Sequence, residues 1–503
     1  MSTRTTHPHA LDCLRSITRP FLLLPFVLFP VAAQTAKVEV KGQPDWSQVR
    51  KIIQQRMAAE SIPSVSIAVV RNGKILWEEG FGWADRENRI PANEHTMYYT
   101  ASITKTFTDT AIMLLQQRKQ LELDRPLNDY LGTAKLSSPA WNPAGATVRR
   151  VMTHTAGLTT FNPVQPLSMD ELISRYGVLF WPPGEGFDYS NAGGIILQGV
   201  VARVSGQSYE SFLRNEIFWP LGMTHTSMAV GPGLESYEAK AYNPVTGLRP
   251  RRTGGVYSSA HDLALFGMFH LKAHLPEQKV ILPDDAIDLM QNSTVPTSFG
   301  KYGFSWTVED DRFGYRSVLS QGGTDAAQAW LRLIPSEKIA VIVLSNSGSG
   351  SFAYIVDEIL STLLPTYGEQ RAKSTAAAPQ NAPANIAPQG PAPAFVGNWA
   401  GIIKTYRGDL PLTLSINAAG DVHIKLGTQL NTLLNDVRFR PQRLSGRFAG
   451  DLGLDDIGVT GYSLHLSLNL RDGALLGAAE TEASARLAFW TELKKVPATI
   501  GEH

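Results

Sequence analysis

Cysteine is nearly absent from this chain of 503 residues, which contains Cys13 and no other. A single cysteine cannot form an intramolecular disulfide, and Cys13 precedes the first apolar run, where it cannot serve as a lipid-attachment site after that run. Thiol catalysis and cysteine metal sites are therefore excluded for the rest of the chain. A main domain of roughly 330 residues is large enough to be held by its hydrophobic core instead.

An excess of charge of either sign is also missing. The chain has 46 Lys and Arg against 45 Asp and Glu, a formal net charge of +1. A nearly neutral chain lacks the basic surface that attracts nucleic acid, so we expect no nucleic-acid partner. Hydrophobic residues make up 43% and charged residues 18%, which is typical of a soluble globular protein. The length predicts two or three domains.

Long apolar runs are missing except at the N-terminus. Residues 1–33 are typical of a bacterial-type signal peptide, because Arg15 and Arg19 precede the apolar residues 21–33 and Val31-Ala32-Ala33 provides small residues for cleavage. The stretch is shorter than the ~20 residues of a transmembrane helix. An uncleaved anchor is the alternative. We expect an exported protein, periplasmic or secreted, with no stable membrane insertion after signal cleavage.

Residues 34–370 show the pattern of an α+β domain. Residues 64–82 predict a β-hairpin with its turn at Asn72-Gly73, and residues 328–345 predict a second hairpin. Strands at both ends of a domain, with helices between them, predict one antiparallel sheet that gathers the two ends of the domain. The clearest helical patterns lie at 107–118, 195–204 and 352–364.

The composition changes after this domain. Residues 371–394 are rich in Ala, Pro, Asn and Gln, and we interpret them as a linker. Residues 395–503 contain short alternating runs separated by glycine turns, which predict an all-β C-terminal domain. Its opening, Gly397-Asn398-Trp399, resembles the G-x-W start of lipocalin-like barrels. This domain shows no catalytic constellation, and the sequence does not determine its role.

Ser102 and Lys105 form the central motif, Ser-Ile-Thr-Lys, ahead of an apolar helical pattern at 107–115. A helix N-terminus presents free N–H groups and a partial positive charge, which favour developing negative charge. Lys105 lies three residues after Ser102 on the same helix face, so its amine can reach the hydroxyl. A lysine beside a hydroxyl in a dry pocket can act as a base. The pattern predicts a nucleophile and its base.

This motif alone leaves a second role open. Ser102 can equally be an N-cap whose hydroxyl accepts a hydrogen bond from a backbone N–H. The chain also contains a second S-x-x-K match at 298–301, which lies among glycines with no helical pattern after it, and we interpret it as a loop. Ser259, followed by Asp262 three residues later, marks another helix start of the capping kind.

Two further motifs carry suitable chemistry. In Tyr189-Ser190-Asn191, a tyrosine near cations can accept a proton, and the amide of Asn191 can hold a substrate carbonyl or the lysine. In residues 321–324, two glycines let a substrate lie close to a strand edge, and the Thr324 N–H can complete an oxyanion hole with the Ser102 N–H. A turn with a packed tyrosine and an ordinary glycine turn are the respective alternatives.

In this order, the three motifs resemble the S-x-x-K, Y-x-N and K-T-G signatures of serine β-lactamases and penicillin-binding proteins. The tyrosine version resembles the class C side of that family, with its D-peptidases and family VIII esterases. The resemblance covers about residues 45–365. Other stretches similar to the family framework are Val151-Met152-Thr153-His154-Thr155-Ala156-Gly157-Leu158, Leu221-Gly222-Met223-Thr224-His225-Thr226, residues 254–260 and residues 302–306.

The resemblance implies the β-lactamase/transpeptidase-like fold, an antiparallel sheet flanked by helices with a helical lobe. It implies an acyl-enzyme on Ser102, with Lys105 and Tyr189 moving the proton, and with no metal or organic cofactor. Asn191 and the third motif (Gln321, Gly322, Gly323 and Thr324) would bind the substrate. His154 would be structural, orienting a loop.

Gln321 departs from the family pattern, in which the third motif begins with Lys or His. A cation there would attract a substrate carboxylate and depress the tyrosine pKa, whereas glutamine only donates a hydrogen bond. The departure favours neutral esters or amides over peptides that carry a carboxylate. Lys301 is a weaker substitute, because it precedes the strand.

Three functions remain open. The first is a hydrolase of small esters, amides or D-amino-acid peptides. The second is a β-lactamase or DD-carboxypeptidase that acts on cell-wall-like substrates. The third is a binding or scaffold protein that kept the fold and lost turnover. His270 and His274 lie four residues apart, but without a glutamate between them we expect core or surface roles. The sequence does not determine the oligomeric state.

Overall fold

The computed structural model describes residues 44–160, 167–251, 253–292, 294–349, 352–377, 390–457, 461–483 and 485–497. The chain divides into two units, Met1–Gln43 and Pro44–His503, and the description below concerns the second. The expected signal peptide at 1–33 lies outside the described residues. No helix among the residues described is both long and apolar enough to cross a bilayer.

Both predicted hairpins form, and they lie next to each other in one antiparallel sheet. Strand β1 (Ser64–Arg71) pairs with β2 (Lys74–Asp85), and β13 (Ala327–Ile334) pairs with β14 (Ile339–Ser345). Asn72 has φ 52° and Gly73 has φ 72°, which is the turn geometry that matches strand twist. Strand β1 pairs with β14 along its length, so the predicted meeting of the two ends of the domain is confirmed.

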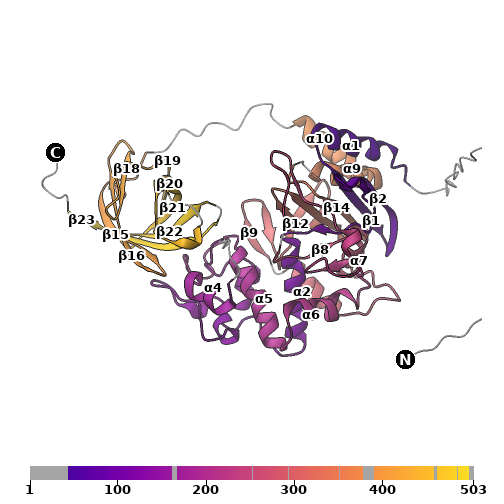
Figure 1. The fold of residues 1–503 in the computed structure, drawn as a ribbon, viewed down its shortest axis with the longest axis horizontal. Coiled ribbons are helices and arrows are strands. Elements are labelled where there is room, and N and C mark those ends of the chain that lie inside the picture. Colours follow the sequence, from indigo (N-terminus) through magenta and orange to yellow (C-terminus); the bar gives the residue numbers. More distant parts are fainter. Residues whose placement is uncertain are drawn as a thin grey trace, which may run out of the picture. The chain divides into compact units, whose positions relative to one another are not determined.

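Helices cover both faces of this sheet, which explains why β14 is buried throughout. Val65, Ile67 and Val69 pack with the helices α1 (Ser47–Ala59) and α9 (Phe352–Leu363), which Figure 1 shows beside α10 (Pro365–Ala377). Ala68 and Val70 face the other side, toward α7 (Ala260–His270). The spatial order is β3 (Ile90–Pro91), β2, β1, β14, β13, β12 (Tyr315–Thr324), β11 (Thr307–Arg312), β10 (Gly300–Tyr302) and β9 (Val295–Thr297).

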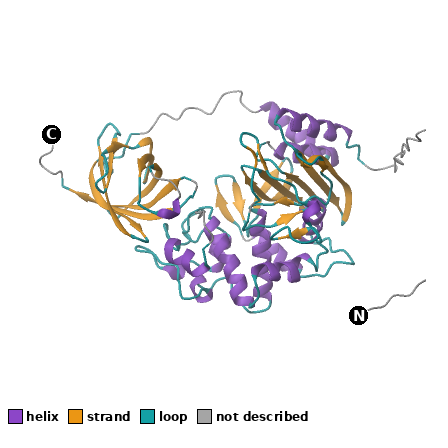
Figure 2. Cartoon of the chain, viewed as in Figure 1, coloured by secondary structure: helices purple, strands orange, loops and turns teal. Residues whose placement is uncertain are grey.

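The helical lobe contains α2 (Ile103–Gln117) and α5 (Asn191–Ser205), both of which extend the predicted helices at their N-terminal ends. Figure 2 shows the helices of this lobe in purple. The earlier start matters, because each helix begins directly after a motif residue.

The smaller helices are α3 (Val148–Met152), α4 (Met169–Tyr176), α6 (Tyr209–Leu213) and α8 (Asp284–Asn292). The short strands are β4 (Tyr98–Tyr99), β5 (Thr226–Ser227), β6 (Tyr242–Asn243), β7 (Gly247–Leu248) and β8 (Tyr257–Ser258).

The expected linker at 371–394 is helical in its first part, and residues 378–389 lie outside the described residues. Helix α10 continues to Ala377, so residues 371–377 are helical and that part of the prediction is wrong. The reason is tertiary. Arg371 forms an ion pair with Glu358 of α9 at 2.8 Å, and its guanidinium lies 4.8 Å from the ring centroid of Tyr354. These contacts hold the helix against α9 despite its alanine-rich, polar composition.

The C-terminal region is all-β, as predicted, and forms a nearly closed barrel. Its strands alternate buried and exposed residues, as along Leu412, Leu414 and Ile416, whose side chains are buried. Trp399 is buried, and its Nε1–H donates to the Phe395 carbonyl at 2.8 Å. The spatial order is β18 (Thr432–Leu433), β17 (Val422–Leu426), β16 (Gly408–Ile416), β15 (Gly397–Thr405), β23 (Ala488–Val496), β22 (Ala474–Glu482), β21 (Tyr462–Arg471), β20 (Arg443–Gly450) and β19 (Asn435–Arg440).

Candidate active site

Ser102 stands directly before α2, but it does not cap that helix. Its backbone is helical, with φ −69° and ψ −12°, and its hydroxyl makes no capping hydrogen bond to the described helix. Ala101 has φ 47°, a left-handed conformation that costs a residue with a Cβ on the order of 1–3 kcal/mol. The N-cap alternative is therefore wrong, and the Ser102 hydroxyl is presented to the pocket.

Lys105 joins the first two motifs. Its Nζ donates to Ser102 Oγ at 3.4 Å and to Asn191 Oδ1 at 2.7 Å, and it lies 4.7 Å from the ring centroid of Tyr189. Asn191 opens α5, which Ser190 caps by accepting the Gly193 N–H. The structure therefore brings Ser102, Lys105, Tyr189 and Asn191 together, as the motifs predicted.

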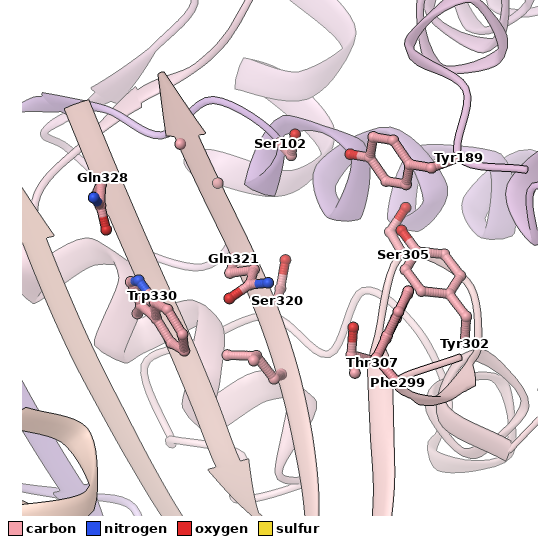
Figure 3. A pocket seen from close by; sticks show the side chains of 13 residues that line it. Ser102, Tyr189, Phe299, Tyr302, Ser305, Thr307, Ser320, Gln321, Gln328 and Trp330 are labelled. Atoms are coloured by element: carbon pink, nitrogen blue, oxygen red, sulfur yellow. The ribbon is translucent and has the colours of Figure 1, made fainter. Parts of the chain in front are cut away.

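Tyr189 points its hydroxyl toward Ser102 (Figure 3) and is fixed by His154. The two rings lie 4.4 Å apart, the Ser190 N–H donates to His154 Nδ1 at 3.1 Å, and the Asp188 N–H donates to the His154 carbonyl at 2.8 Å. Burial, with the charge of Lys105, holds the pKa of His154 well below its usual value. The neutral ring accepts at Nδ1 and holds the segment on both sides of Tyr189, so its expected structural role is confirmed.

Strand β12 brings the third motif against the start of α2. Its ladder with β11 ends at Leu319, before the motif begins. A Cβ on Gly322 would lie 2.2 Å from the Thr100 carbonyl oxygen and 2.6 Å from the Ser102 nitrogen, so only glycine permits this approach. A Cβ on Gly323 would meet only the Ala327 carbonyl oxygen, at 4.0 Å, and Thr324 ends the strand. The role of the Thr324 N–H as second oxyanion donor stays a prediction.

These elements enclose a pocket of about 370 Å³ (Figure 3). None of its thirteen lining residues carries a charged side chain. Trp330 of β13 and Leu319 of β12 provide apolar surface, and Gln321 provides an uncharged amide. The lining residues are Ser102, Tyr189, Phe299, Tyr302, Ser305, Thr307, Leu319, Ser320, Gln321, Gly322, Gly323, Gln328 and Trp330.

Several residues that line the pocket belong to none of the three motifs. Gln328 and Trp330 lie two apart on β13, and the period of two in a strand would have placed them on one face. Phe299 lies within the second S-x-x-K match, where no helix follows, as expected. That segment is nevertheless the β9–β10 hairpin and its turn, and it brings Phe299 and Tyr302 to the pocket. The resemblance of residues 302–306 to the family framework did not indicate that Tyr302 lines the pocket, and no sequence signal pointed to Phe299.

The remaining candidates lie outside the pocket lining. Lys301 forms an ion pair with Asp310 at 2.6 Å, so it does not replace the missing cation of the third motif. His270 is buried against Trp306, and burial lowers its pKa to about 3. His274 Nε2 lies 2.7 Å from Asp284. The two histidines thus have separate partners. In the described part of the chain, no group of three His, Cys, Asp or Glu is suited to a metal ion.

Comparison with known proteins agrees with this geometry. The family model described as Beta-lactamase matches residues 49–364. Protein flp of Staphylococcus aureus (strain N315) is 25% identical over 334 residues, which cover 62% of this chain and 65% of that protein, slightly less than two thirds of its length.

Solved structures share the fold at low identity. The octameric penicillin-binding protein homologue from Pyrococcus abyssi is similar with a TM-score of 0.58 and 22% identity, over 88% of this chain and 100% of that one. A class C beta lactamase from Rhodobacter sphaeroides is similar with a TM-score of 0.54 and 21% identity, over 65% of this chain and 99% of that one. The predicted fold of the main domain is confirmed.

Proposed function

The chain belongs to the beta-lactamase family, and from this premise we propose that it is a serine hydrolase that cleaves small uncharged esters or amides through an acyl-enzyme on Ser102. The observation that carries the proposal is the pocket beside Ser102, in which all thirteen lining side chains are uncharged. A neutral lining favours neutral substrates, because burying an ionised carboxylate without a partner costs on the order of several kcal/mol.

In the first step, Ser102 Oγ forms a bond with the substrate carbonyl carbon. Its proton passes to Lys105 Nζ, which lies 3.4 Å away and is oriented by Asn191. The carbonyl oxygen becomes an oxyanion at the Ser102 N–H, with the Thr324 N–H as the proposed second donor. The bond to the leaving alcohol or amine then breaks, and the leaving group takes the proton from the Lys105–Tyr189 pair.

In the second step, a water molecule attacks the acyl carbon and the bond to Ser102 Oγ breaks. The Lys105–Tyr189 pair gave one proton to the leaving group and can therefore accept the water proton. Tyr189, with its own proton passed to Lys105, is the proposed acceptor, because its oxygen points toward Ser102 and His154 fixes its position. The proton returns to Ser102 Oγ as the acid product leaves. Every proton in this cycle moves among groups of this chain, the substrate and water.

Gln321 separates this proposal from the β-lactamase and DD-carboxypeptidase alternative. Those substrates carry a carboxylate, and the position that holds Lys or His in the family is occupied by an uncharged amide on β12. Lys301 offers no replacement, because it is paired with Asp310. The substrate carboxylate would therefore lose its water without gaining a cation.

A matched pair of substrates tests the proposal. We expect kcat/KM for p-nitrophenyl butyrate to exceed that for p-nitrophenyl hemisuccinate by at least about tenfold, and we expect Q321K to narrow this ratio. Q328K is the matched control, since it adds the same charge to the pocket lining on the neighbouring strand. A ratio near one, or equal effects of the two variants, would contradict the role given to Gln321.

Covalent labelling tests the acyl-enzyme itself. We expect a fluorophosphonate to label the wild-type chain and not S102A, and we expect a fluorescent penicillin to label the wild type weakly. If neither probe labels a folded wild-type chain, the binding or scaffold alternative is favoured. Strong penicillin labelling would favour the β-lactamase alternative.

The proposal includes an exported location, which rests on Arg15, Arg19 and the apolar residues 21–33. Expression of the full chain in a bacterial host, followed by fractionation and N-terminal sequencing, tests it. A mature N-terminus at Gln34 would support export with cleavage. An intact Met1 in the cytoplasmic fraction would contradict it.

A further inference from the structure

Asp109 is a buried carboxyl that the proposed reaction leaves unused. It lies two helical turns after Ser102 and one turn after Lys105 on α2, and only 1% of its surface is exposed. The described residues contain no ion pair to it. Its Oδ2 accepts a hydrogen bond from Ser305 Oγ at 2.6 Å. A carboxyl placed this way links the helix that carries the nucleophile to another part of the chain.

That other part is the wall of the pocket. Ser305 lines the pocket and has φ 58°, a left-handed conformation that its surroundings must hold. The Thr106 hydroxyl on α2 lies 3.3 Å from the Ser305 carbonyl oxygen and 2.6 Å from Ser320 Oγ, and Ser320 also lines the pocket. Asp109 and Thr106 therefore connect one helix to the pocket wall at neighbouring points.

The ionisable groups that face Asp109 come from three elements. Lys105 lies on the same helix, Tyr209 on α6 and Tyr302 on β10. Burial raises the pKa of Asp109 to about 8, against the opposing effects of the Ser305 hydrogen bond and the Lys105 charge. Burial also raises the pKa of Tyr209 and of Tyr302, and the Asp109 carboxyl contributes to both shifts. Lys105 is thus the single cation in this set.

We propose that Asp109 is a positioning residue of this hydrolase: uncharged, it holds α2 against the pocket wall at Ser305, and as an anion it suppresses acylation of Ser102 at alkaline pH. The inference rests on the proposed acyl-enzyme reaction. It adds a residue that touches no substrate and acts through Lys105 and Ser305.

The sign of the pH effect follows from the charges. An anionic Asp109 one turn from Lys105 stabilises the ammonium form of that lysine, which opposes removal of the Ser102 proton. The same charge disfavours the oxyanion that forms at the Ser102 N–H. Acylation should therefore fall as pH rises past about 8, by about tenfold per pH unit for the loss of one proton.

The experiment compares the full chain with D109N and D109A. The readouts are the fluorophosphonate labelling rate and kcat/KM for p-nitrophenyl butyrate from pH 6 to pH 10. We expect D109N, which keeps a polar group for Ser305 and cannot ionise, to stay within about threefold of wild type at pH 7 and to lose the alkaline decline. We expect D109A to lose about tenfold or more at pH 7, because its hydrogen bond is gone.

The matched control is D262N, which removes a buried carboxyl from α7, outside the pocket lining. It should retain the wild-type pH profile. S305A provides a second test that does not depend on the folding of D109A. The Ser305 hydrogen bond lowers the pKa of Asp109, so its loss should move the alkaline decline to higher pH.

Two results would overturn the inference while leaving the proposed function intact. One is an alkaline decline in D109N identical to that of wild type, and the other is equal activity of D109N and D109A at pH 7. A wild-type chain that is not labelled at Ser102 at any pH would instead overturn the proposed function, and the inference with it.

Discussion

Helices α2 and α7 each begin directly after a serine, but only the serine before α7 caps its helix. Ser259 has an extended backbone, with φ −92° and ψ 163°, and its Oγ accepts the Asp262 N–H at 3.1 Å. Ser102 has a helical backbone and makes no such bond to the described helix. The same residue type at the same helix position caps one helix and is the proposed nucleophile at the other.

The backbone before each serine explains the difference. An N-cap needs extended dihedral angles so that its oxygen can reach the N–H two or three residues on. Ala101, with φ 47°, instead turns Ser102 into the helical region. This conformation is unfavourable by itself, and it persists because α2 is buried along Ile103, Phe107 and Ile112. Hydrophobic packing thus maintains a strained turn that keeps the hydroxyl out of the cap.

Removing the two hydroxyls should separate catalysis from capping, and S102A should show the largest effect. We expect kcat/KM for p-nitrophenyl butyrate to fall on the order of 10⁴-fold or more, because the acyl-enzyme can no longer form. The midpoint of thermal unfolding should change little, since the Ser102 hydroxyl caps nothing. If S102A instead lowered the free energy of unfolding by about 1 kcal/mol, as the loss of an N-cap does, Ser102 would have a structural role like that of Ser259.

Adding a methyl group beside α2, at Gly322 of β12, should give the next largest effect, and the same change within α7, at Gly267, is its control. A Cβ at Gly322 would lie 2.6 Å from the Ser102 nitrogen, so G322A must push β12 away from α2. We expect about a 10²-fold loss of kcat/KM, since a displacement near 1 Å disrupts the reacting geometry. On α7, a Cβ at Gly267 would meet Ala340 Cβ at 3.0 Å, so G267A should lower stability and leave activity intact. If G267A also lost activity, the distortion of α7 would have to reach the active site, which would contradict this separation.

The two buried acids should give different pH dependences of stability. Burial raises the pKa of Asp262 from 3.8 to about 6 and that of Asp109 to about 8. Each folded state holds its proton longer than the unfolded chain, so stability is full at low pH and falls as pH rises toward the folded pKa.

Urea unfolding of wild type, D262N and D109N from pH 4 to pH 9 measures this difference. We expect wild type to lose about 2 kcal/mol relative to D262N between pH 4 and pH 6, and less than about 0.5 kcal/mol more above pH 6. Relative to D109N, the free energy of unfolding of wild type should continue to decrease until about pH 8. Parallel curves for the two variants would contradict the stronger desolvation of Asp109.

S259A should give the smallest effect. Removing the cap of α7 leaves the Asp262 N–H without its side-chain acceptor, which costs about 1 kcal/mol in the free energy of unfolding. Activity should stay within about twofold of wild type, because Ser259 does not line the pocket. Equal stability in urea would show that the bond at Ser259 is not needed for the helix.

Local patterns were sufficient for much of the fold. The turn at Asn72-Gly73 and the alternating runs predicted for the C-terminal region depend on near neighbours in the chain. Both predictions were confirmed, the second by the strand that contains Leu412, Leu414 and Ile416. The helical end of the expected linker was missed, because α10 depends on Arg371 meeting Glu358 and Tyr354 of another helix. Composition cannot reveal a partner that only packing supplies.

The candidate site divides in the same way. The motif spacing brought Ser102, Lys105, Tyr189 and Asn191 into one prediction, because the order of three motifs is a property of the chain itself. Trp330 lies in no motif, and the resemblance of residues 302–306 to the family framework did not predict that Tyr302 and Ser305 line the pocket, since these residues reach it from separate strands and loops. Asp109 was missed because a single acid in a helix is ordinary until its burial is known.

The sequence by itself determined the antiparallel sheet of the main domain, the all-β character of the C-terminal region, the three motifs and the uncharged residue at the start of the third motif. Only the tertiary structure decided that Ser102 is not a cap, that Gly322 must be a glycine and that Asp109 meets the pocket wall. The physical reason is distance. Turns, caps and strand periods are set by residues a few positions apart, whereas a strained backbone, a close approach and a desolvated carboxyl exist only once distant segments pack together.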